Sequence, residues 1–374
     1  MVKRLALVSF FPREPNVIRG GVEGVTDCLT AGLRNLSNLE IHVIAPCGQL
    51  DKQVEYRDGV TIHWIRQSSL PGFIEYWTTF RRAAFRRLLE IHPDIVHFQG
   101  LAGWTLGYNG PYVLTIHGIP ERDILFSGRA FRYARRQVIS VVERLGRKRS
   151  SHTILISPYV KNELDKQLVA KCWDIENPVT PEVFQIVKAA EAGRVLYVGR
   201  INERKNILGL LRAFASVHAR FAGATLRLAG DADDENYMRR CTAFIAERGL
   251  SDAVHLLGNI SRRSLMTELG AATCLALFAK QETAPLIVEE AMAAALPVVA
   301  SRVGGLPYLV SEGETGFLVD PEDEQQFADQ LLRVLTDLTL ATRMGRQARD
   351  TANLRFHVSV VAGRTLEVYD AVMN

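Results

Sequence analysis

The fold is decided by Glu282-Thr-Ala-Pro-Leu-Ile-Val-Glu-Glu290, which places two carboxylates eight positions apart. The apolar run 275–278 precedes it and is typical of a buried strand, and Pro285 suits the first turn of a helix. In α/β sheets, ligands bind where a buried strand ends in a loop and a helix begins. We therefore expect Glu282 on a loop after a strand and Glu290 about one turn into the next helix. The alternative is that Glu282 and Glu290 are acids exposed on the surface of a helix, and we expect the neighbouring Glu289 to be such an acid.

Short β-rich runs alternate with amphipathic helical runs on both sides of this stretch. The alternation predicts parallel sheets covered by helices on both faces. It restarts after 176–192, where Asn177-Pro178 and Thr180-Pro181 interrupt regular structure. With a length of 374 residues, this predicts an α/β protein of two doubly wound, Rossmann-like domains that face each other across a cleft. The predicted parts are 1–178, 179–355 and a C-terminal helix over 356–374.

Six strands are predicted in each domain, because each run is short, apolar and flanked by turn residues. The predicted strands of the first domain are 5–10, 41–45, 61–65, 95–98, 113–116 and 153–156. The predicted strands of the second domain are 194–198, 225–229, 254–257, 273–278, 298–300 and 316–319.

The composition is that of a globular protein, with 47% hydrophobic and 23% charged residues. No apolar run approaches the ~20 residues that span a bilayer, and the short N-terminal apolar run is typical of a strand rather than a signal peptide. The five cysteines are scattered and form no Cys-x-x-Cys pair, which argues against a disulfide framework or a zinc site. We therefore predict a cytoplasmic location.

Positive charge is concentrated in the first domain. Residues 1–178 contain 24 Lys and Arg against 17 Asp and Glu, whereas 179–374 contain 21 against 24. Arginines alternate with aromatic residues in 80–89 and recur in 131–149. This pattern is typical of a face that contacts an anionic membrane, although solvated helix faces have the same pattern. No nucleic-acid recognition motif accompanies the arginines, so nucleic acid is not an expected partner.

A second group of candidate residues lies in Leu196-Tyr-Val-Gly-Arg-Ile-Asn-Glu-Arg-Lys-Asn206. A strand is expected to end at Gly199, and Arg200 and Lys205 follow on a loop that leads into a helix. Cations beside a helix start form an anion site, because the free backbone N–H groups there add partial positive charge. A solvated basic loop is the alternative.

The first domain offers further candidates. Gly20-Gly21 precede a predicted helix, and glycine lets a backbone approach a phosphate closely, although a flexible turn has the same sequence. His117 ends a predicted strand, where it either reaches a ligand or has a structural role. The chain contains no Gly-x-Gly-x-x-Gly and no Walker sequence, which disfavours dehydrogenases and P-loop enzymes. No histidine-based set of ligands indicates a metal.

Taken together and in this order, the motifs resemble those of retaining glycosyltransferases of family 4, which have the GT-B architecture. The resemblance covers nearly the whole chain and is strongest from 194 to 320. Each motif is common by itself, whereas the ordered set is specific. The matching motifs are Gly20-Gly21, His117, Val198-Gly-Arg200, Lys205-Asn206, Leu228-Ala-Gly230, the Glu-x7-Glu stretch 282–290 with Ala291-Met292, and Pro297-Val-Val-Ala-Ser301.

The resemblance implies a donor site. Arg200 and Lys205 match the pair that grips the donor diphosphate, and Glu290 matches the acid that binds the donor ribose. Glu282 matches the acid that contacts the transferred sugar near the reacting carbon. The remaining implied contacts are the phosphate-binding amides of Leu286 and Ile287, Gly199 at the strand end, Gly20 and Gly21 near the diphosphate, and His117 beside the sugar.

The resemblance further implies a retaining hexosyltransferase that uses a UDP- or GDP-sugar as donor and needs neither a cofactor nor a metal. The expected acceptor is a glycan or a lipid-linked molecule in cell-surface polysaccharide or glycolipid synthesis, and the enzyme is expected at the inner face of the membrane if the basic helices of the first domain contact it. The last helix is expected to pack back on the N-terminal domain.

Two departures from the family pattern bear on this interpretation. Thr283-Ala284-Pro285 replaces a frequent Gly-Phe-Gly, so the resemblance does not identify the donor sugar. Ala295 stands where a helix-ending glycine is usual. The alternatives to a transferase are a sugar-nucleotide epimerase of the same architecture and a non-catalytic sugar-nucleotide-binding protein.

Overall fold

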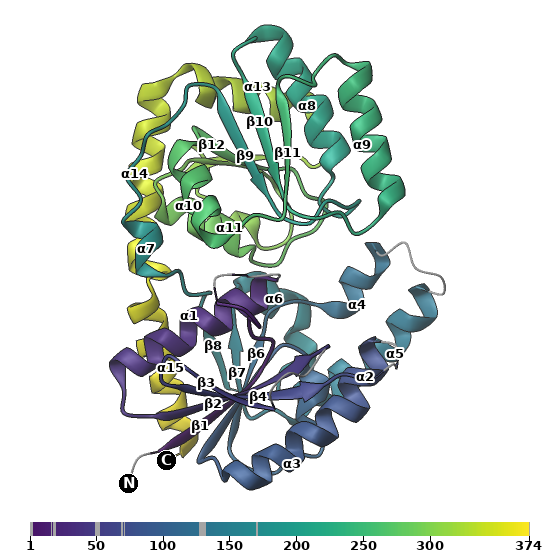
Figure 1. Cartoon of the computed structure of the whole chain (residues 1–374), viewed down its shortest axis with the longest axis vertical. Coiled ribbons are helices and arrows are strands. Elements are labelled where there is room, and N and C mark those ends of the chain that lie inside the picture. Colours follow the sequence, from purple (N-terminus) through teal and green to yellow (C-terminus); the bar gives the residue numbers. More distant parts are fainter. Residues whose placement is uncertain are drawn as a thin grey trace. The chain divides into compact units, whose positions relative to one another are not determined.

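The computed structural model describes residues 3–15, 17, 20–48, 53–68, 70, 72–126, 132–169 and 171–373 (Figure 1). By its internal contacts the chain divides into two compact units. Unit 1 comprises Met1–Pro178 and Val358–Asn374, and unit 2 comprises Val179–His357. Each unit is built on a largely parallel sheet flanked by helices, which confirms the predicted α/β class.

Unit 1 contains an eight-stranded sheet in the order β3-β4-β2-β1-β5-β6-β7-β8, in which only the β3–β4 pair is antiparallel. The central strand β1 is apolar and buried from Leu5 to Val8, as expected for a strand covered on both faces. The strand order reverses between β1 and β5. The strands are β1 (Arg4–Val8), β2 (Glu40–Cys47), β3 (Val54–Arg57), β4 (Val60–Arg66), β5 (Ile95–Gln99), β6 (Tyr112–Ile116), β7 (His152–Leu155) and β8 (Lys171–Asp174).

Helices cover both faces of this sheet (Figure 1). Helices α1 and α15 pack together on one face, while α3 and α5 cover the other. The α-helices are α1 (Gly21–Leu36), α2 (Gly72–Glu75), α3 (Arg81–Ile91), α4 (Pro120–Asp123), α5 (Arg132–Arg149), α6 (Pro158–Leu164) and α15 (Val358–Met373). The shorter elements are the π-helix η1 (Tyr76–Phe80) and the 3₁₀ turns η2 (Ala102–Thr105), η3 (Ile124–Phe126) and η4 (Asp165–Gln167).

Helix α15 is part of unit 1 although it follows unit 2 in the sequence. Its Tyr369 hydroxyl lies 2.7 Å from Nδ1 of His97 on β5, and both side chains are buried. Gly32 of α1 admits Val358, because a Cβ at position 32 would collide with the valine side chain. These buried contacts make α15 part of the unit 1 core.

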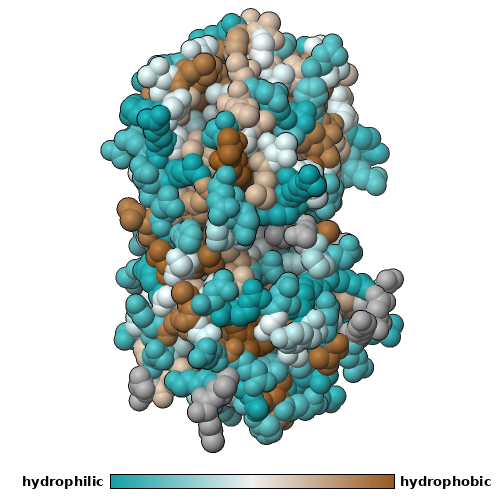
Figure 2. All heavy atoms as spheres, turned by 60° about the vertical axis from the view of Figure 1, so that its left-hand side comes forward, coloured by the Kyte–Doolittle hydropathy of each residue, from teal (hydrophilic) through white to brown (hydrophobic). Residues whose placement is uncertain are grey.

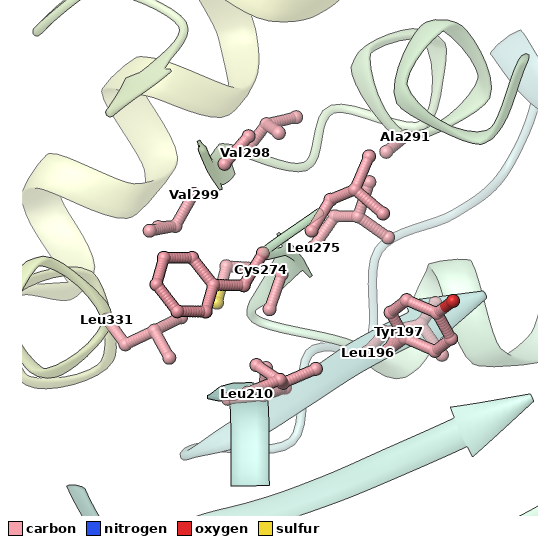
Figure 3. Packing of buried hydrophobic residues seen from close by; sticks show 14 of the residues in the cluster. Leu196, Tyr197, Leu210, Cys274, Leu275, Ala291, Val298, Val299 and Leu331 are labelled. Atoms are coloured by element: carbon pink, nitrogen blue, oxygen red, sulfur yellow. The ribbon is translucent and has the colours of Figure 1, made fainter. Parts of the chain in front are cut away.

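Unit 2 contains a six-stranded parallel sheet in the order β11-β10-β9-β12-β13-β14, and its strand order reverses between β9 and β12. Figure 3 shows its core, where Leu196, Leu275 and Val299 come from three neighbouring strands. The strands are β9 (Arg194–Val198), β10 (Thr225–Ala229), β11 (Val254–Gly258), β12 (Cys274–Leu277), β13 (Val298–Ser301) and β14 (Gly316–Val319). The helices are α7 (Pro181–Phe184), α8 (Ile207–Arg220), α9 (Glu235–Glu247), α10 (Arg262–Ala271), α11 (Leu286–Ala293), α12 (Leu306–Leu309), α13 (Glu324–Thr336) and α14 (Leu338–Arg355).

The surface shown in Figure 2 is dominated by hydrophilic residues, and hydrophobic residues appear on it in small, separate groups. No helix in the described part of the chain is both long enough and apolar enough to cross a membrane.

One residue of the predicted basic face over 131–149 is placed differently from the prediction. Arg147 is fully buried, and its guanidinium forms a bidentate pair with Glu121 at 2.6 and 2.9 Å. It also donates to Oε1 of Gln167 at 2.8 Å and lies 3.9 Å from Glu143. Arg147 is therefore a structural residue and not part of a charged surface.

Helix α11 ends at an alanine in the position where a glycine is usual, and it still forms the hydrogen bonds of a glycine-type helix end. The Leu296 N–H donates to the Ala291 carbonyl at 2.9 Å and the Ala295 N–H donates to the Met292 carbonyl at 3.0 Å, which is the Schellman arrangement. Ala295 has a φ of 57°, a left-handed conformation that costs a non-glycine residue about 1–2 kcal/mol.

Replacing Ala295 with glycine is expected to raise the free energy of unfolding by about 0.5–1 kcal/mol, since part of the relieved strain is offset by the greater flexibility of glycine in the unfolded chain. The midpoint of urea unfolding measures the effect. The control is Ala294→Gly, where φ is −80° and no strain is relieved, so that variant should be less stable than the parent. A lower midpoint for Ala295→Gly would contradict the expectation.

Candidate active site

The candidate site of unit 2 lies at the carboxyl ends of β9 and β12. These neighbouring strands flank the point where the strand order reverses, which is where α/β sheets bind ligands. The loop 199–206 connects β9 to α8, and the loop 278–285 connects β12 to α11. The two loops bring Lys205 and Glu282 into direct contact across 77 positions of sequence.

The loop after β9 is held by hydrogen bonds to its backbone. The hydroxyl of buried Tyr197 donates to the Arg200 carbonyl at 2.8 Å, and burial raises the pKa of this phenol well above its ordinary value. The Lys205 N–H donates to Oδ1 of Asn202 at 3.0 Å. Gly199, with a φ of 151°, makes the turn out of the strand. The loop thus presents Arg200 and Lys205 from a defined backbone.

Glu282 is the centre of a buried charge cluster. Its Oε1 pairs with the Lys205 ammonium, and its Oε2 lies 3.5 Å from the Arg204 guanidinium. Only 4% of Glu282 and 8% of Lys205 is exposed. Gly304 is needed on the other side, because a Cβ there would collide with the Glu282 carbonyl oxygen, which also accepts from the Gly305 N–H at 3.0 Å. The solvated-loop alternative therefore does not apply to Lys205.

Arg200 is in a different environment from Lys205. Its side chain is 56% exposed, and its Nε lies 2.9 Å from Oδ1 of Asp233. An exposed ion pair of this kind contributes about 0.2–1 kcal/mol. Arg200 can therefore exchange Asp233 for an anionic ligand at little cost.

Helix α11 contributes its N-terminus and Glu290. The N–H groups of Leu286 and Ile287 lie in its first turn, where helical N–H groups have no partner within the helix. Glu290 is 5% exposed and forms an ion pair with Arg262 at the start of α10. The Arg262 guanidinium also donates to Oγ1 of Thr180 at 3.1 Å, so Glu290 is held in place by a positioned cation.

The expectation that Glu289 is an exposed helix acid is wrong. Its side chain has no solvent-accessible surface, and nearly all of α11 is buried. A helix that is buried all round shows no polar stripe, so its sequence does not reveal whether an acid on it is exposed or buried.

The candidates of the first half of the chain belong to unit 1. His117 follows β6, and its Nε2 lies 3.1 Å from Oε1 of Gln99 at the end of β5. Burial lowers its pKa to about 4, so the ring is neutral at neutral pH and its Nε2–H donates to the amide oxygen. Gly20 and Gly21 begin α1, and a Cβ at either position would meet no atom within 4 Å. Packing therefore does not require glycine at these two positions, and their role near the donor diphosphate stays a prediction.

Three charged partners in unit 2 were not among the predicted residues. Arg204 contacts Glu282, Asp233 contacts Arg200, and Arg262 contacts Glu290. Arg204 lies directly before Lys205, and a loop has no periodicity that would indicate that both adjacent cations face Glu282. Asp233 and Arg262 come from segments that only the folded sheet brings near.

Two family models match the chain. The model described as Glycosyltransferase Family 4 matches residues 19–183, and the model described as Glycosyl transferases group 1 matches residues 180–351. Together they span residues 19–351, which leaves β1 and α15 of unit 1 outside the matches.

The chain is also similar in sequence to individual proteins of bacteria. The D-inositol 3-phosphate glycosyltransferase of Corynebacterium glutamicum is 33% identical over 48% of this chain and 44% of its own length. The N-acetyl-alpha-D-glucosaminyl L-malate synthase of Bacillus anthracis is 26% identical over 77% of this chain and 75% of its own length. The chain thus spans less than half of the first relative and three quarters of the second.

Solved structures have the same fold. A sucrose-phosphate synthase from Thermosynechococcus elongatus matches 99% of both chains with a TM-score of 0.85 and 22% identity. Anabaena HepE in complex with UDP-glucose matches 98% of this chain and 99% of its own, with a TM-score of 0.75 and 18% identity. With the two family models, these likenesses place the protein: the chain belongs to the glycosyltransferases of GT-B architecture related to family 4.

Proposed function

We propose that the protein transfers a hexosyl unit from a nucleoside-diphosphate sugar to an acceptor hydroxyl, with retention of the anomeric configuration and without a metal. The observation that carries the proposal is the buried Lys205–Glu282 pair at the strand-order reversal of unit 2. A fixed cation and carboxylate at that position suit a ligand with both an anionic and a hydroxylated part.

The proposed roles follow from the contacts of each residue. As the donor C1–O bond breaks, negative charge develops on the diphosphate, and Lys205, Arg200 and the first turn of α11 stabilise it. Glu282 keeps Lys205 in place and accepts from hydroxyls of the moving sugar. Glu290, held by Arg262, accepts from the ribose hydroxyls. The acceptor oxygen bonds to C1 and passes its proton to the leaving phosphate.

A thermal-shift screen with UDP-, GDP- and ADP-sugars tests the donor, because a ligand that binds only the native state raises its stability. A donor at 100 times its Kd stabilises the native state by about 2.7 kcal/mol.

The anomeric configuration of the product, measured by NMR, tests retention, and activity in the presence of EDTA tests metal independence. Conversion of the donor to an isomer without acceptor would instead identify an epimerase, and binding without any turnover a non-catalytic protein.

We further propose that α5 contacts an anionic membrane, which would place the enzyme beside a lipid-linked acceptor. Val138, Val141 and Leu145 are each more than half exposed, and their spacing of three and four places them on one face of the helix. Arg144 and Lys148, also exposed, flank this apolar stripe. Exposed apolar residues between cations suit the boundary of an anionic bilayer.

Val141→Glu with Leu145→Glu is expected to abolish sedimentation with vesicles rich in phosphatidylserine at low salt, because it adds negative charge to the stripe. The control is Leu354→Glu on α14 of unit 2, where a leucine that is 78% exposed lies outside the stripe. Raising the salt should release the parent protein. Equal binding by the Val141/Leu145 variant and the parent would refute membrane contact through α5.

A further inference from the structure

Arg200 forms its ion pair on the side of β9 opposite to the candidate site. Its Nε lies 2.9 Å from Oδ1 of Asp233, which is on the loop that follows β10. In the sheet, β10 and β12 lie on opposite sides of β9, and the strand order reverses between β9 and β12. Because α/β sheets bind ligands at such a reversal, the ion pair holds the Arg200 guanidinium away from the edge where a ligand is expected.

The other cation of the same loop is paired on the side of the candidate site. Lys205 contacts Glu282 on the loop that follows β12, and both residues are buried. The side chains of Arg200 and Asp233 are 56% and 37% exposed. Since solvent and salt screen an exposed pair, the Arg200–Asp233 contact is the one that a ligand can displace.

Asp233 is held in place by groups other than Arg200. The Asn202 side-chain amide donates to Oδ2 of Asp233 at 2.6 Å. The backbone on both sides is joined as well, because the Ile201 N–H donates to the Asp231 carbonyl at 2.9 Å and the Asp233 N–H donates to the Ile201 carbonyl at 3.3 Å. If Arg200 turns to another partner, the Asp233 carboxylate therefore keeps a hydrogen bond and its position.

The backbone of Arg200 is also fixed, so a change of partner involves its side chain alone. The Tyr197 hydroxyl donates to the Arg200 carbonyl at 2.8 Å. Oδ1 of Asn202 accepts from the Lys205 N–H at 3.0 Å, and this contact fixes which end of the Asn202 amide faces Asp233. The loop between the two cations is thus anchored at several points.

A diphosphate and Asp233 would bind the same guanidinium. Arginine suits phosphate because its planar group donates two parallel hydrogen bonds to two oxygens. We propose that Asp233 holds Arg200 on the β10 side of its loop and competes with the donor diphosphate for it. A ligand whose binding-competent state is only partly populated binds with a correspondingly lower apparent affinity, so Asp233 weakens donor binding. This rests on the proposed transferase function and adds a residue that sets the affinity for the donor.

Isothermal titration calorimetry with UDP, GDP and ADP tests the competition, and the nucleotide that the parent binds is used for the variants. Asp233→Asn removes the charge but keeps an oxygen that accepts from Asn202, and it should lower the Kd about 1.5- to 5-fold. Arg200→Ala should raise the Kd. Adding Asp233→Asn to Arg200→Ala should then change the Kd little, because no guanidinium is left to compete for.

Glu203→Gln is the matched control. It also removes one negative charge from the exposed surface of this site, but Glu203 pairs with Arg240 at 2.7 Å and not with Arg200. Its Kd should equal that of the parent. An equal gain in affinity in Glu203→Gln, or a gain from Asp233→Asn that persists without Arg200, would indicate a general charge effect and overturn the competition.

Kinetics and binding together separate this inference from the proposed function. With the sugar donor, Asp233→Asn should lower KM and leave kcat unchanged, because freeing Arg200 favours ground-state and transition-state binding alike. Unchanged or weaker nucleotide binding, or a lower kcat, would show instead that Asp233 supports Arg200, and would overturn the competition alone. If none of the three nucleotides bound the parent, the proposed donor site would be wrong, and this inference with it.

Discussion

Replacing Lys205 with alanine is expected to lower turnover by a factor on the order of 10²–10³, the usual loss when one preorganised stabilising donor is removed. The change removes the cation proposed to stabilise the leaving diphosphate and leaves Glu282 with the more distant Arg204. Steady-state kinetics with the identified donor measures the effect. Because the loss arises as the C1–O bond breaks, it should appear in kcat more than in KM.

Two further variants separate catalysis from stability at this site. Removing one partner of a buried pair destabilises the fold, whereas removing both leaves no unpaired charge. Lys205→Met combined with Glu282→Gln should therefore recover part of the stability lost in Lys205→Ala without recovering turnover, since Arg204 loses its carboxylate but keeps its bond to the Gln281 carbonyl at 3.0 Å. The control is Arg212→Ala, which breaks an exposed pair with Glu324 in the same unit and should leave kcat unchanged. Full turnover in Lys205→Ala would remove Lys205 from the proposed mechanism.

Replacing Arg147 with leucine is expected to destabilise unit 1 by about 3–5 kcal/mol, because Glu121 would remain buried without its bidentate partner. Glu143 lies 3.9 Å from Arg147 and would lose this cation as well. Its carboxyl, whose pKa is raised by burial, would keep only the hydrogen bonds from the backbone N–H groups of Ala102 and Gly103. Chemical denaturation measures the loss.

Arg144→Leu is the matched control, since Arg144 lies one turn earlier on the same helix and is exposed. It should change the free energy of unfolding by less than about 0.5 kcal/mol. If the two variants had equal stability, the buried cluster would not hold α5 on the unit. Loss of vesicle binding in Arg144→Leu without loss of stability would agree with the proposed membrane face.

The sequence predicts the sheets well because buried parallel strands are short apolar runs bounded by turns. It does not reveal β3, in which exposed residues alternate with half-buried ones, or β8, which is at the opposite edge of the sheet. Edge strands bury little apolar surface, so they lack the pattern on which the prediction depends.

Some features of the predicted site and of the basic helix follow from the sequence, and others do not. The contact of Lys205 with Glu282 follows from the strand order, because loops after neighbouring parallel strands meet at one edge. The burial of Arg147 was not predictable, since a basic run does not show which of its arginines points inward. Arg147 is buried because an acid from another segment, Glu121, meets it there.

Helix α15 has a consequence for synthesis on the ribosome. Unit 2 is one continuous segment, whereas unit 1 lacks the helix that packs against α1 until residues 358–373 have been translated. Domains generally fold in the order in which they emerge, but here the first to emerge is the last to be completed. The apolar face of α1 in unit 1 is therefore uncovered while unit 2 is being made, and during that time unit 1 can aggregate or bind a chaperone.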